Sequence, residues 1–351
     1  MKKFLKYMSP LAPDQSGACG VFYEFGGLIV ICDAGGCAGN ICGFDEPRWF
    51  DKKSAVFSAG LRDMDAIMGR DDKLIEKLNL AYSQLGGNFA LIVSTPVPAV
   101  IATDMKSLER MGEKKLGIPC IAIDATGTHL YDYGEEKAWL RLFEIFAVDK
   151  KETIKGRVGI LGATPMETGF KDSESLNALL KDSDINEAVI YSMGTTLDDV
   201  RNAGTCEKNI VISNAAIKAA EYLKEKFGIP YEIKYPFIPK EILDKTNGKD
   251  LGKTLIIHSQ FAGNELRNLI NASEADVCTW FSLNKSFAKE NDASLSGEDD
   301  LINILSENKY DTIIADSDAF RLIESTGFAG ELIDYPEFSV SGRGFDFTPN
   351  L

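Results

Sequence analysis

The sequence predicts an α/β fold built as three units with parallel sheets. Short, continuously apolar runs rich in Val and Ile recur along the chain, as is typical of strands buried on both faces of a parallel sheet. Stretches with a helical period separate these runs, and this alternation indicates open α/β domains. Two charged stretches, residues 148–157 and 239–253, interrupt the alternation. They predict units at 1–150, 151–248 and 249–335, followed by a C-terminal tail at 336–351 that packs back onto the chain.

Nine apolar runs are the predicted strands of these units. They are residues 27–32, 89–95 and 119–124 in the first unit, 157–162, 187–192 and 209–214 in the second, and 254–259, 311–316 and 330–335 in the third. Helical periodicity predicts helices at 72–86, 173–183 and 215–228. The last of these ends at Gly228 and is followed by Pro230, which is a usual helix stop.

Composition and charge restrict the possible function classes. Hydrophobic residues make up 44% and charged residues 26% of the chain, which is typical of a globular protein. A net charge of −15 argues against binding to nucleic acid or to an anionic membrane, because both need clustered Lys and Arg. No apolar run is long enough to span a membrane, and the N-terminal residues lack the apolar segment of a signal peptide. We therefore expect a cytoplasmic protein.

Nucleotide-binding motifs are missing from the strand–helix junctions. The chain contains neither G-x-x-x-x-G-K-[ST] nor a G-x-G-x-x-G that opens a helix after a strand. We therefore expect this chain to bind no nucleotide and to hydrolyse no ATP.

Seven cysteines are the most informative residues, and four of them lie close together near the N-terminus. In a reducing compartment they are expected to be free thiols, and thiolate ligands select iron–sulfur clusters, zinc or copper(I). Cys19 and Cys37 lie in glycine-rich segments, "QSGACG" and "AGGCAGN", which we interpret as loops that let an inorganic cluster approach the backbone. The alternative is that the glycines serve a tight turn and the thiols are incidental.

The other cysteines are less strong candidates. Cys42 is a weaker ligand candidate, since C-x4-C-x4-C over Cys32, Cys37 and Cys42 matches no common zinc or ferredoxin spacing. Cys32 ends a predicted strand, and this position favours a role in the core over metal ligation. Core positions are also predicted for Cys120 and Cys278, and Cys206 is predicted to lie in a loop.

Several segments, taken in order, resemble component 1 of nitrogenase and its nitrogenase-like relatives. "SGACG" and "DAGGCAGN" are similar to the family's first and second cluster-ligand segments, which puts Cys19 and Cys37 on ligand positions. Three longer segments continue the likeness, namely "FSAGLRDMDAIMGRDDKLIEKL", "NFALIVSTPVPAVIATDM" and residues 183–237. In its length the chain is similar to the compact homodimeric reductive cyclase of the family rather than to nitrogenase proper.

The resemblance implies a fold, a cofactor and partners. It implies three Rossmann-like units, a dimer with an iron–sulfur cluster at the subunit interface, and a separate ATP-hydrolysing iron protein as electron donor. The family's third ligand position is Pro96 here, so an eight-iron cluster with six cysteine ligands is not expected. Cys19 and Cys37 from two subunits would supply four thiolates, which suits one 4Fe–4S cluster on a two-fold axis. Cys42 is the alternative for the missing ligand.

Two other polar residues are site candidates. Arg48, in "GFDEPRWF", either lines a cofactor pocket or belongs to a solvated turn anchored by Trp49. His129 follows a predicted strand in a glycine-containing loop, where α/β folds place ligands, and is a candidate proton donor or else a surface residue. His258 is predicted to be a core or strand-end histidine.

These observations predict the electron-accepting catalytic component of a nitrogenase-like, ATP-dependent reductase that acts on an unsaturated small molecule. Two alternatives stay open: a non-catalytic carrier or assembly scaffold for an iron–sulfur cluster, and a metal-free binding or sensor protein with the same fold.

Overall fold

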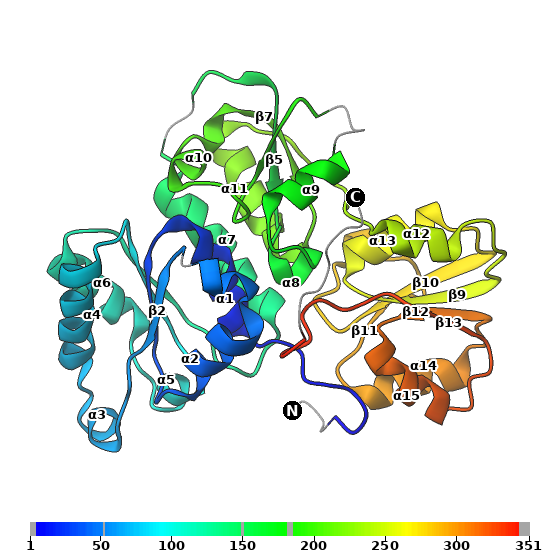
Figure 1. Cartoon of the computed structure of the whole chain (residues 1–351), viewed down its shortest axis with the longest axis horizontal. Coiled ribbons are helices and arrows are strands. Elements are labelled where there is room, and N and C mark those ends of the chain that lie inside the picture. Colours follow the sequence, from blue (N-terminus) through cyan, green and yellow to red (C-terminus); the bar gives the residue numbers. More distant parts are fainter. Residues whose placement is uncertain (1–4, 52, 149–150, 181–184, 344–351) are drawn as a thin grey trace.

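The computed structural model describes residues 5–51, 53–148, 151–180 and 185–343 (Figure 1). Three parallel sheets confirm the predicted α/β class. The first has the order β2-β1-β3-β4, formed by Ala55–Ser58, Leu28–Ile31, Ala90–Val93 and Cys120–Ile123. The second has the order β6-β5-β7-β8, formed by Glu187–Ile190, Ile154–Leu161, Cys206–Val211 and Tyr231–Ile233. The third has the order β11-β10-β9-β12-β13, formed by Ala293–Ser294, Glu274–Thr279, Lys253–Ile257, Thr312–Ala315 and Glu331–Asp334.

Every strand pairing within these sheets is parallel. Each sheet lies within one of the three predicted ranges, which we call the first, second and third unit; the unit boundaries themselves stay predictions. All nine predicted apolar runs contain a strand, namely β1, β3, β4, β5, β6, β7, β9, β12 and β13. Cys206 is the first residue of β7 and is buried, so its assignment to a loop was wrong.

The three predicted helices appear as α4 (Asp71–Leu85), α9 (Ser173–Leu180) and α11 (Ile217–Phe227). The expected end of α9, residues 181–183, lies outside the described residues. The other α-helices are α1 (Asp14–Phe22), α2 (Gly36–Asn40), α3 (Asp63–Met68), α5 (Pro96–Val100), α6 (Met105–Leu116), α7 (Tyr131–Phe146), α8 (Pro165–Thr168), α10 (Leu197–Arg201), α12 (Lys240–Thr246), α13 (Gln260–Leu269), α14 (Glu298–Glu307) and α15 (Phe320–Ser325). Short helical turns occupy Tyr23–Phe25, Ile41–Asp45, Pro47–Asp51, Ala203–Thr205, Asn214–Ala216, Lys285–Phe287 and Ser317–Ala319.

Helix α7 lies at the centre of the molecule and joins the first two units (Figure 1). It packs against α1 of the first unit and against α10 and α11 of the second. Glycines allow the close crossing with α1, because a Cβ on Gly17 would lie 2.0 Å from the Tyr131 carbonyl oxygen and a Cβ on Gly134 would lie 1.8 Å from the Asp14 carbonyl oxygen. The glycines of "QSGACG" therefore serve helix packing.

One buried apolar cluster runs through all three units. It includes Ile29 from the first sheet, Ile160 from the second and Val277 from the third. Separate clusters cover the remaining face of the first sheet and of the third sheet. The units therefore share packing, and the site residues described below are held by one connected core.

The described part of the tail contacts the first and third units, and the packing of the tail as a whole stays a prediction. The Ser341 hydroxyl donates to Asp45 (2.7 Å) in the first unit, and Arg343 pairs with Asp316 in the third. Residues 344–351 of the predicted tail lie outside the described residues. Within the described part of the chain, no helix is long and apolar enough to cross a membrane.

Candidate functional site

Two of the three candidate ligand thiols lie at the carboxyl end of β1. The chain leaves the strand through Cys32 and Asp33, turns at Gly35, and enters α2, which carries Cys37. Asp33 stabilises this turn, because its carboxylate accepts hydrogen bonds from the Ala38 amide (2.8 Å) and from the Ser58 hydroxyl on β2 (2.5 Å). The helical turn Ile41–Asp45 then places Cys42. Both Cys37 and Cys42 are partly exposed.

Cys19 is positioned differently from the sequence-based expectation. It lies inside α1 and is fully buried, so its placement in a glycine-rich loop was wrong. The physical reason is the close packing of α1 on α7, which the small residues around Cys19 permit. A hydrogen bond of 2.6 Å from the Ser16 hydroxyl to Asp45 ties α1 to the turn that carries Cys42.

Burial and neighbouring carboxylates raise the pKa of all three thiols. Burial raises the pKa of the Cys19 thiol well above its usual value, and Glu46 and Cys42 raise it further. Burial also raises the pKa of Cys42 to about 11, with smaller contributions from Glu46 and Asp33. The pKa of Cys37 is raised by burial and by Asp33, and a hydrogen bond with Thr95 lowers it. In this environment a nearby metal cation would be needed to hold the thiols as thiolates at neutral pH.

Pro96, at the family's third ligand position, lies next to the same site. It begins α5 directly after Thr95, whose hydroxyl donates to the Cys32 carbonyl oxygen (2.8 Å) and also contacts Cys37. The Pro96 ring is exposed, and on one side it lies close to the loop after β4, since a Cβ on Gly127 would lie 2.5 Å from the ring. Proline therefore offers no thiol at the position that the resemblance assigns to the third ligand.

The surface around Cys37 and Cys42 is open, and we call it the glycine face. A Cβ built on Gly35, Gly36, Gly39 or Gly43 would meet no described atom within 4 Å. The Phe44 side chain beside it is 58% exposed. Small residues and partly exposed thiols fit the approach of a bulky inorganic group. Among the described residues of the single chain, no three His, Cys, Asp or Glu side chains converge in a way that would hold a metal ion.

The remaining cysteines lie in the core. Cys32 and Cys120 are buried in the cluster that covers one face of the first sheet, and Cys278 is buried in the cluster of the third sheet. These placements agree with the core positions predicted for them. His258 is buried as well and stacks on Tyr335 with ring centroids 3.9 Å apart, in agreement with a core or strand-end role.

Arg48 is buried and connects two units of the chain, and we call this arrangement the Arg48 clamp. Its side chain is 1% exposed, and its guanidinium makes two hydrogen bonds of 2.7 Å to the carboxylate of Glu46. It also donates to the carbonyl oxygens of Gly20 (2.7 Å) and Ser192 (2.6 Å), which joins the first unit to the second. These contacts are structural and are not those of a solvated turn. A role for Arg48 towards a cofactor stays a prediction.

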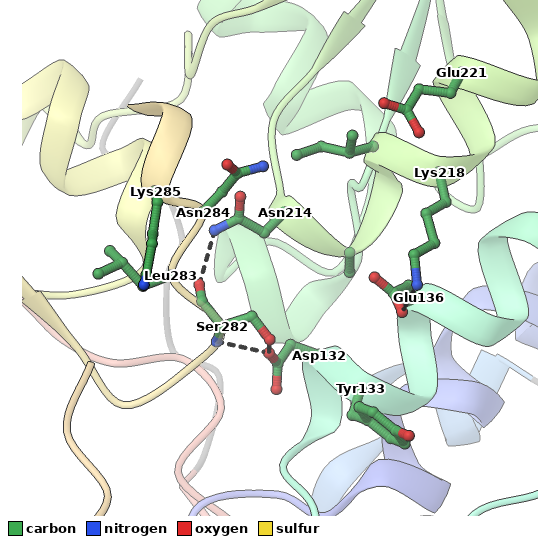
Figure 2. Close-up of a pocket in the computed structure, with 12 residues that line it drawn as sticks. Asp132, Tyr133, Glu136, Asn214, Lys218, Glu221, Ser282, Leu283, Asn284 and Lys285 are labelled. Atoms are coloured by element: carbon green, nitrogen blue, oxygen red, sulfur yellow. Dashed lines mark hydrogen bonds and ion pairs between the residues drawn. The ribbon is translucent and has the colours of Figure 1, made fainter. Parts of the chain in front are cut away.

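A pocket of about 450 Å³ lies where the three units meet (Figure 2), and we call it the junction pocket. Its lining residues come from α7, from the start of α11 and from the segment after β10, and they are Asp132, Tyr133, Glu136, Asn214, Ala215, Ile217, Lys218, Glu221, Ser282, Leu283, Asn284 and Lys285. The Ser282 hydroxyl and amide donate to Asp132 (2.6 and 2.9 Å), and the Asn214 side-chain amide donates to the Ser282 carbonyl oxygen (2.8 Å). The pocket wall is therefore polar and largely held in place.

His129 borders this region from the loop after β4. It is exposed, stacks on Tyr133 with ring centroids 4.1 Å apart, and lines a second pocket of about 370 Å³ that shares Asp132, Tyr133 and Ser282 with the first. Its role as a proton donor stays a prediction.

The junction-pocket residues were missed at the sequence level, although a signal for some of them was present. Asn214 follows β7 and Ser282 follows β10, and the carboxyl ends of parallel strands are where α/β folds place ligands. Their polar side chains directly after apolar runs were the available signal.

Comparisons with known proteins agree with this fold. A family described as nitrogenase component 1 type oxidoreductase matches residues 15–244. Among solved structures, a chain described as nitrogenase Cp1 at pH 6.5 is similar with a TM-score of 0.68 and 11% identity, covering 98% of this chain and 92% of that chain. Another, nitrogenase Cp1 at pH 5, has a TM-score of 0.66 and 15% identity, covering 98% and 88%. No curated protein matches the sequence. The structural likeness shows the fold, and the family match, which spans well over half of the sequence, shows that this chain belongs to the nitrogenase component 1 type oxidoreductases.

Proposed function

We propose that this chain is the electron-accepting catalytic component of a nitrogenase-like, ATP-dependent reductase. The observation that carries the proposal is the pair of partly exposed thiols, Cys37 and Cys42, on the open glycine face. Family membership supports an oxidoreductase. The substrate in this proposal is an unsaturated small molecule that binds in the junction pocket.

The residues that would hold an iron–sulfur cluster are Cys37 and Cys19, with Cys42 as a further ligand. Two copies of the chain that each contribute Cys19 and Cys37 supply the four thiolates of one 4Fe–4S cluster. When bound, such a cluster accepts and donates single electrons. Cys42 lies near enough to Cys19 to raise its pKa and is partly exposed, which makes it the alternative ligand when Cys19 stays in the core.

The chain's own residues have the tasks of binding and proton delivery. The junction pocket presents carboxylates, amides and two lysines, Lys218 and Lys285, to a polar substrate. Lys218 is paired with Glu136 (2.7 Å), which holds both side chains at the pocket wall. His129 at the edge of the pocket is the proposed proton donor for the substrate.

The proposed partners are a second copy of this chain and a separate ATP-hydrolysing iron protein. The missing phosphate-binding loop supports this division of labour. We place the assembly in the cytoplasm, and the free state of all seven cysteines supports a reducing compartment.

Purification without oxygen, followed by iron and sulfide analysis, tests the cluster. We expect bound iron and sulfide in the wild type and loss of both in Cys37→Ala, whose fold is kept because the thiol is partly exposed. Cys120→Ala is the matched control: its thiol is in the core, so the variant keeps iron and loses about 1 kcal/mol of unfolding free energy. The proposal is wrong if Cys37→Ala keeps its iron or if the wild type binds none.

Sedimentation analysis tests the shared cluster. We expect a homodimer, and Phe44→Asp should weaken it and lower the iron content together, because Phe44 lies on the glycine face. Leu269→Asp, at a similarly exposed apolar residue of the third unit, should change neither. A stable wild-type monomer that retains full iron would contradict the shared site.

Two alternative functions each have an observation in their favour. The open position of the thiols suits a carrier that passes a cluster to another enzyme. The absence of a thiol at Pro96 and the raised thiol pKa values suit a metal-free binding protein. Substrate reduction in the presence of an iron protein and ATP separates the reductase from the carrier, and a colourless protein purified without oxygen favours the metal-free alternative.

A further inference from the structure

Three carboxyl groups are buried near one another where the three units meet. They are Glu135 on α7, Glu167 on α8 and Glu337 in the segment after β13, and each side chain is at most 5% exposed. We call them the junction carboxyls. Neither the predicted cluster site nor the proposed role of His129 uses them.

Glu167 is the central member because its side chain contacts all three units. It accepts hydrogen bonds from the Tyr131 hydroxyl of the first unit and the Ser259 hydroxyl of the third, both 2.8 Å long. Glu167 itself belongs to the second unit, and the Ser213 hydroxyl of that unit lies near enough to lower the pKa of Glu167. These hydroxyls both orient the carboxyl group and connect it to its surroundings.

Four buried polar atoms around Glu167 have no hydrogen-bond partner among the described residues. They are one carboxyl oxygen each of Glu135 and Glu337, the Tyr335 hydroxyl, and Nδ1 of His258. The other oxygen of Glu135 accepts from Thr164 (2.6 Å), and that of Glu337 accepts from Ser339 (3.0 Å). Buried polar groups are normally satisfied, so these atoms indicate bound protons and water at this position.

Burial of three carboxyl groups near one another also favours their protonated forms. Burial raises the pKa of Glu167 to about 7, while burial and then Glu167 raise that of Glu337 to about 8. For Glu135, burial raises the pKa well above its usual value despite the Thr164 hydrogen bond and the more distant Arg48.

The other titratable groups that face the junction carboxyls do not compensate their negative charge. Asp132 adds negative charge, and burial lowers the pKa of His258 to about 4, so this ring is neutral. Three tyrosines complete the surroundings, Tyr131, Tyr235 and Tyr335, and burial raises the pKa of each.

Asp132 relates the junction carboxyls to the junction pocket. It lines the pocket, and its charge is near enough to raise the pKa of both Glu167 and Glu337. Tyr131, which donates to Glu167, precedes Asp132 in the chain, and Ser213 precedes Asn214, another lining residue that lies beside Ser282 in Figure 2. The buried carboxyl groups therefore lie near the pocket wall.

We propose that Glu167 and Glu337 hold exchangeable protons at the junction of the three units and supply them to a substrate in the junction pocket. The inference rests on the proposed reductase function. For each electron that the proposed reductase reaction would deliver to the substrate, one O–H bond of Glu167 breaks and its proton passes to the substrate along the hydroxyl groups and water around Glu167. The Glu167 carboxylate left behind is reprotonated by Glu337, which regains its proton from water.

Infrared difference spectroscopy of the purified protein tests the proton store without turnover. Raising the pH from about 6 to about 9 should bleach a protonated-carboxyl C=O band in two steps, because the two groups interact and titrate as a pair. Glu167→Gln should remove one step and move the other to lower pH, since Glu337 loses a negative neighbour. Glu337→Gln is the second variant in case the first does not fold, and it should likewise leave a single step.

Glu144→Gln, on the solvent side of the same helix α7, is the control and should keep both steps. The proton store is refuted if no carboxyl band titrates in this range or if both Gln variants keep the wild-type titration. Because this readout needs no cluster, it is independent of whether the proposed reductase function holds.

A second measurement tests proton delivery in the cluster-loaded protein. Glu167→Gln should accept electrons from the iron protein as fast as the wild type but reduce substrate at least tenfold more slowly. Its turnover rate should also lack the change near neutral pH that the titration of Glu167 causes in the wild type. Unchanged turnover with an unchanged pH profile would refute delivery. A failure of the proposed function itself would instead appear as no substrate reduction in the wild type.

Discussion

At the scale of single residues, Arg48 shows how a polar motif is used inside the fold. A buried guanidinium is stable only when its donors are paired, and here Glu46 and two carbonyl oxygens of different units supply the acceptors. The sequence "GFDEPRWF" indicates a charged pair but cannot show that the acceptors Gly20 and Ser192 come from distant segments. This is why its burial was not predicted.

Replacing Arg48 by Met should therefore be costly. Glu46 would be left buried without a positive partner, while Glu24 would keep only Lys53, so we expect a loss of about 3–5 kcal/mol in unfolding free energy. Urea unfolding followed by circular dichroism measures it. Arg70→Met is the control, because the Arg70–Asp72 pair is exposed and should contribute little. Equal midpoints for the two variants would contradict the clamp.

At the scale of elements, apolar runs predicted the strands well. The glycine-rich segment around Cys19 was assigned wrongly, as a loop instead of a helix. All nine runs contain strands because a strand buried on both faces needs continuous apolar residues. Four strands were missed: β2, β8 and β11 are short edge strands, and β10 begins with Glu274 and carries Asp276. The glycines around Cys19 were interpreted as a loop, because close helix packing depends on a partner helix that is far along the chain.

Substitution of Gly17 by Ala should separate α1 from α7. The added Cβ would meet the Tyr131 backbone, which cannot move aside as a side chain can, so we expect a loss of about 3 kcal/mol despite the better helix propensity of Ala. Thermal or urea unfolding of the metal-free chain measures the change. Gly39→Ala in α2 is the matched control: its Cβ meets open space, and stability should stay within about 0.5 kcal/mol. Similar losses for both would refute the packing argument.

At the scale of the whole molecule, the three sheets point loops from their carboxyl ends toward one junction. Sequence reasoning predicted the three sheets and placed Cys37 and Cys42 at one strand end. The assembly of the pocket and of the junction carboxyls was not predictable in the same way. Glu135, Glu167 and Glu337 are separated by long stretches of chain, and nothing local distinguishes them from surface glutamates.

The junction carboxyls should also make stability depend on pH. Because the pKa of Glu167 is about 7 and that of Glu337 about 8 in the folded chain, against 4.5 for an ordinary glutamate, the folded state binds more protons than the unfolded state between these values. The unfolding free energy should then fall as the pH rises from about 4.5 towards 8, with Glu167 alone contributing on the order of 3 kcal/mol.

Glu167→Gln removes this term while keeping an acceptor for the Tyr131 or Ser259 hydroxyl. Its unfolding free energy should decline less steeply as the pH rises. The stability of the variant relative to the wild type should therefore increase between about pH 5 and pH 8. Urea unfolding across this range measures both profiles, with Glu144→Gln as the control that follows the wild type. Parallel profiles for Glu167→Gln and the wild type would mean that Glu167 is ionised in the folded chain, so that the three units are joined around a buried charge rather than around a proton.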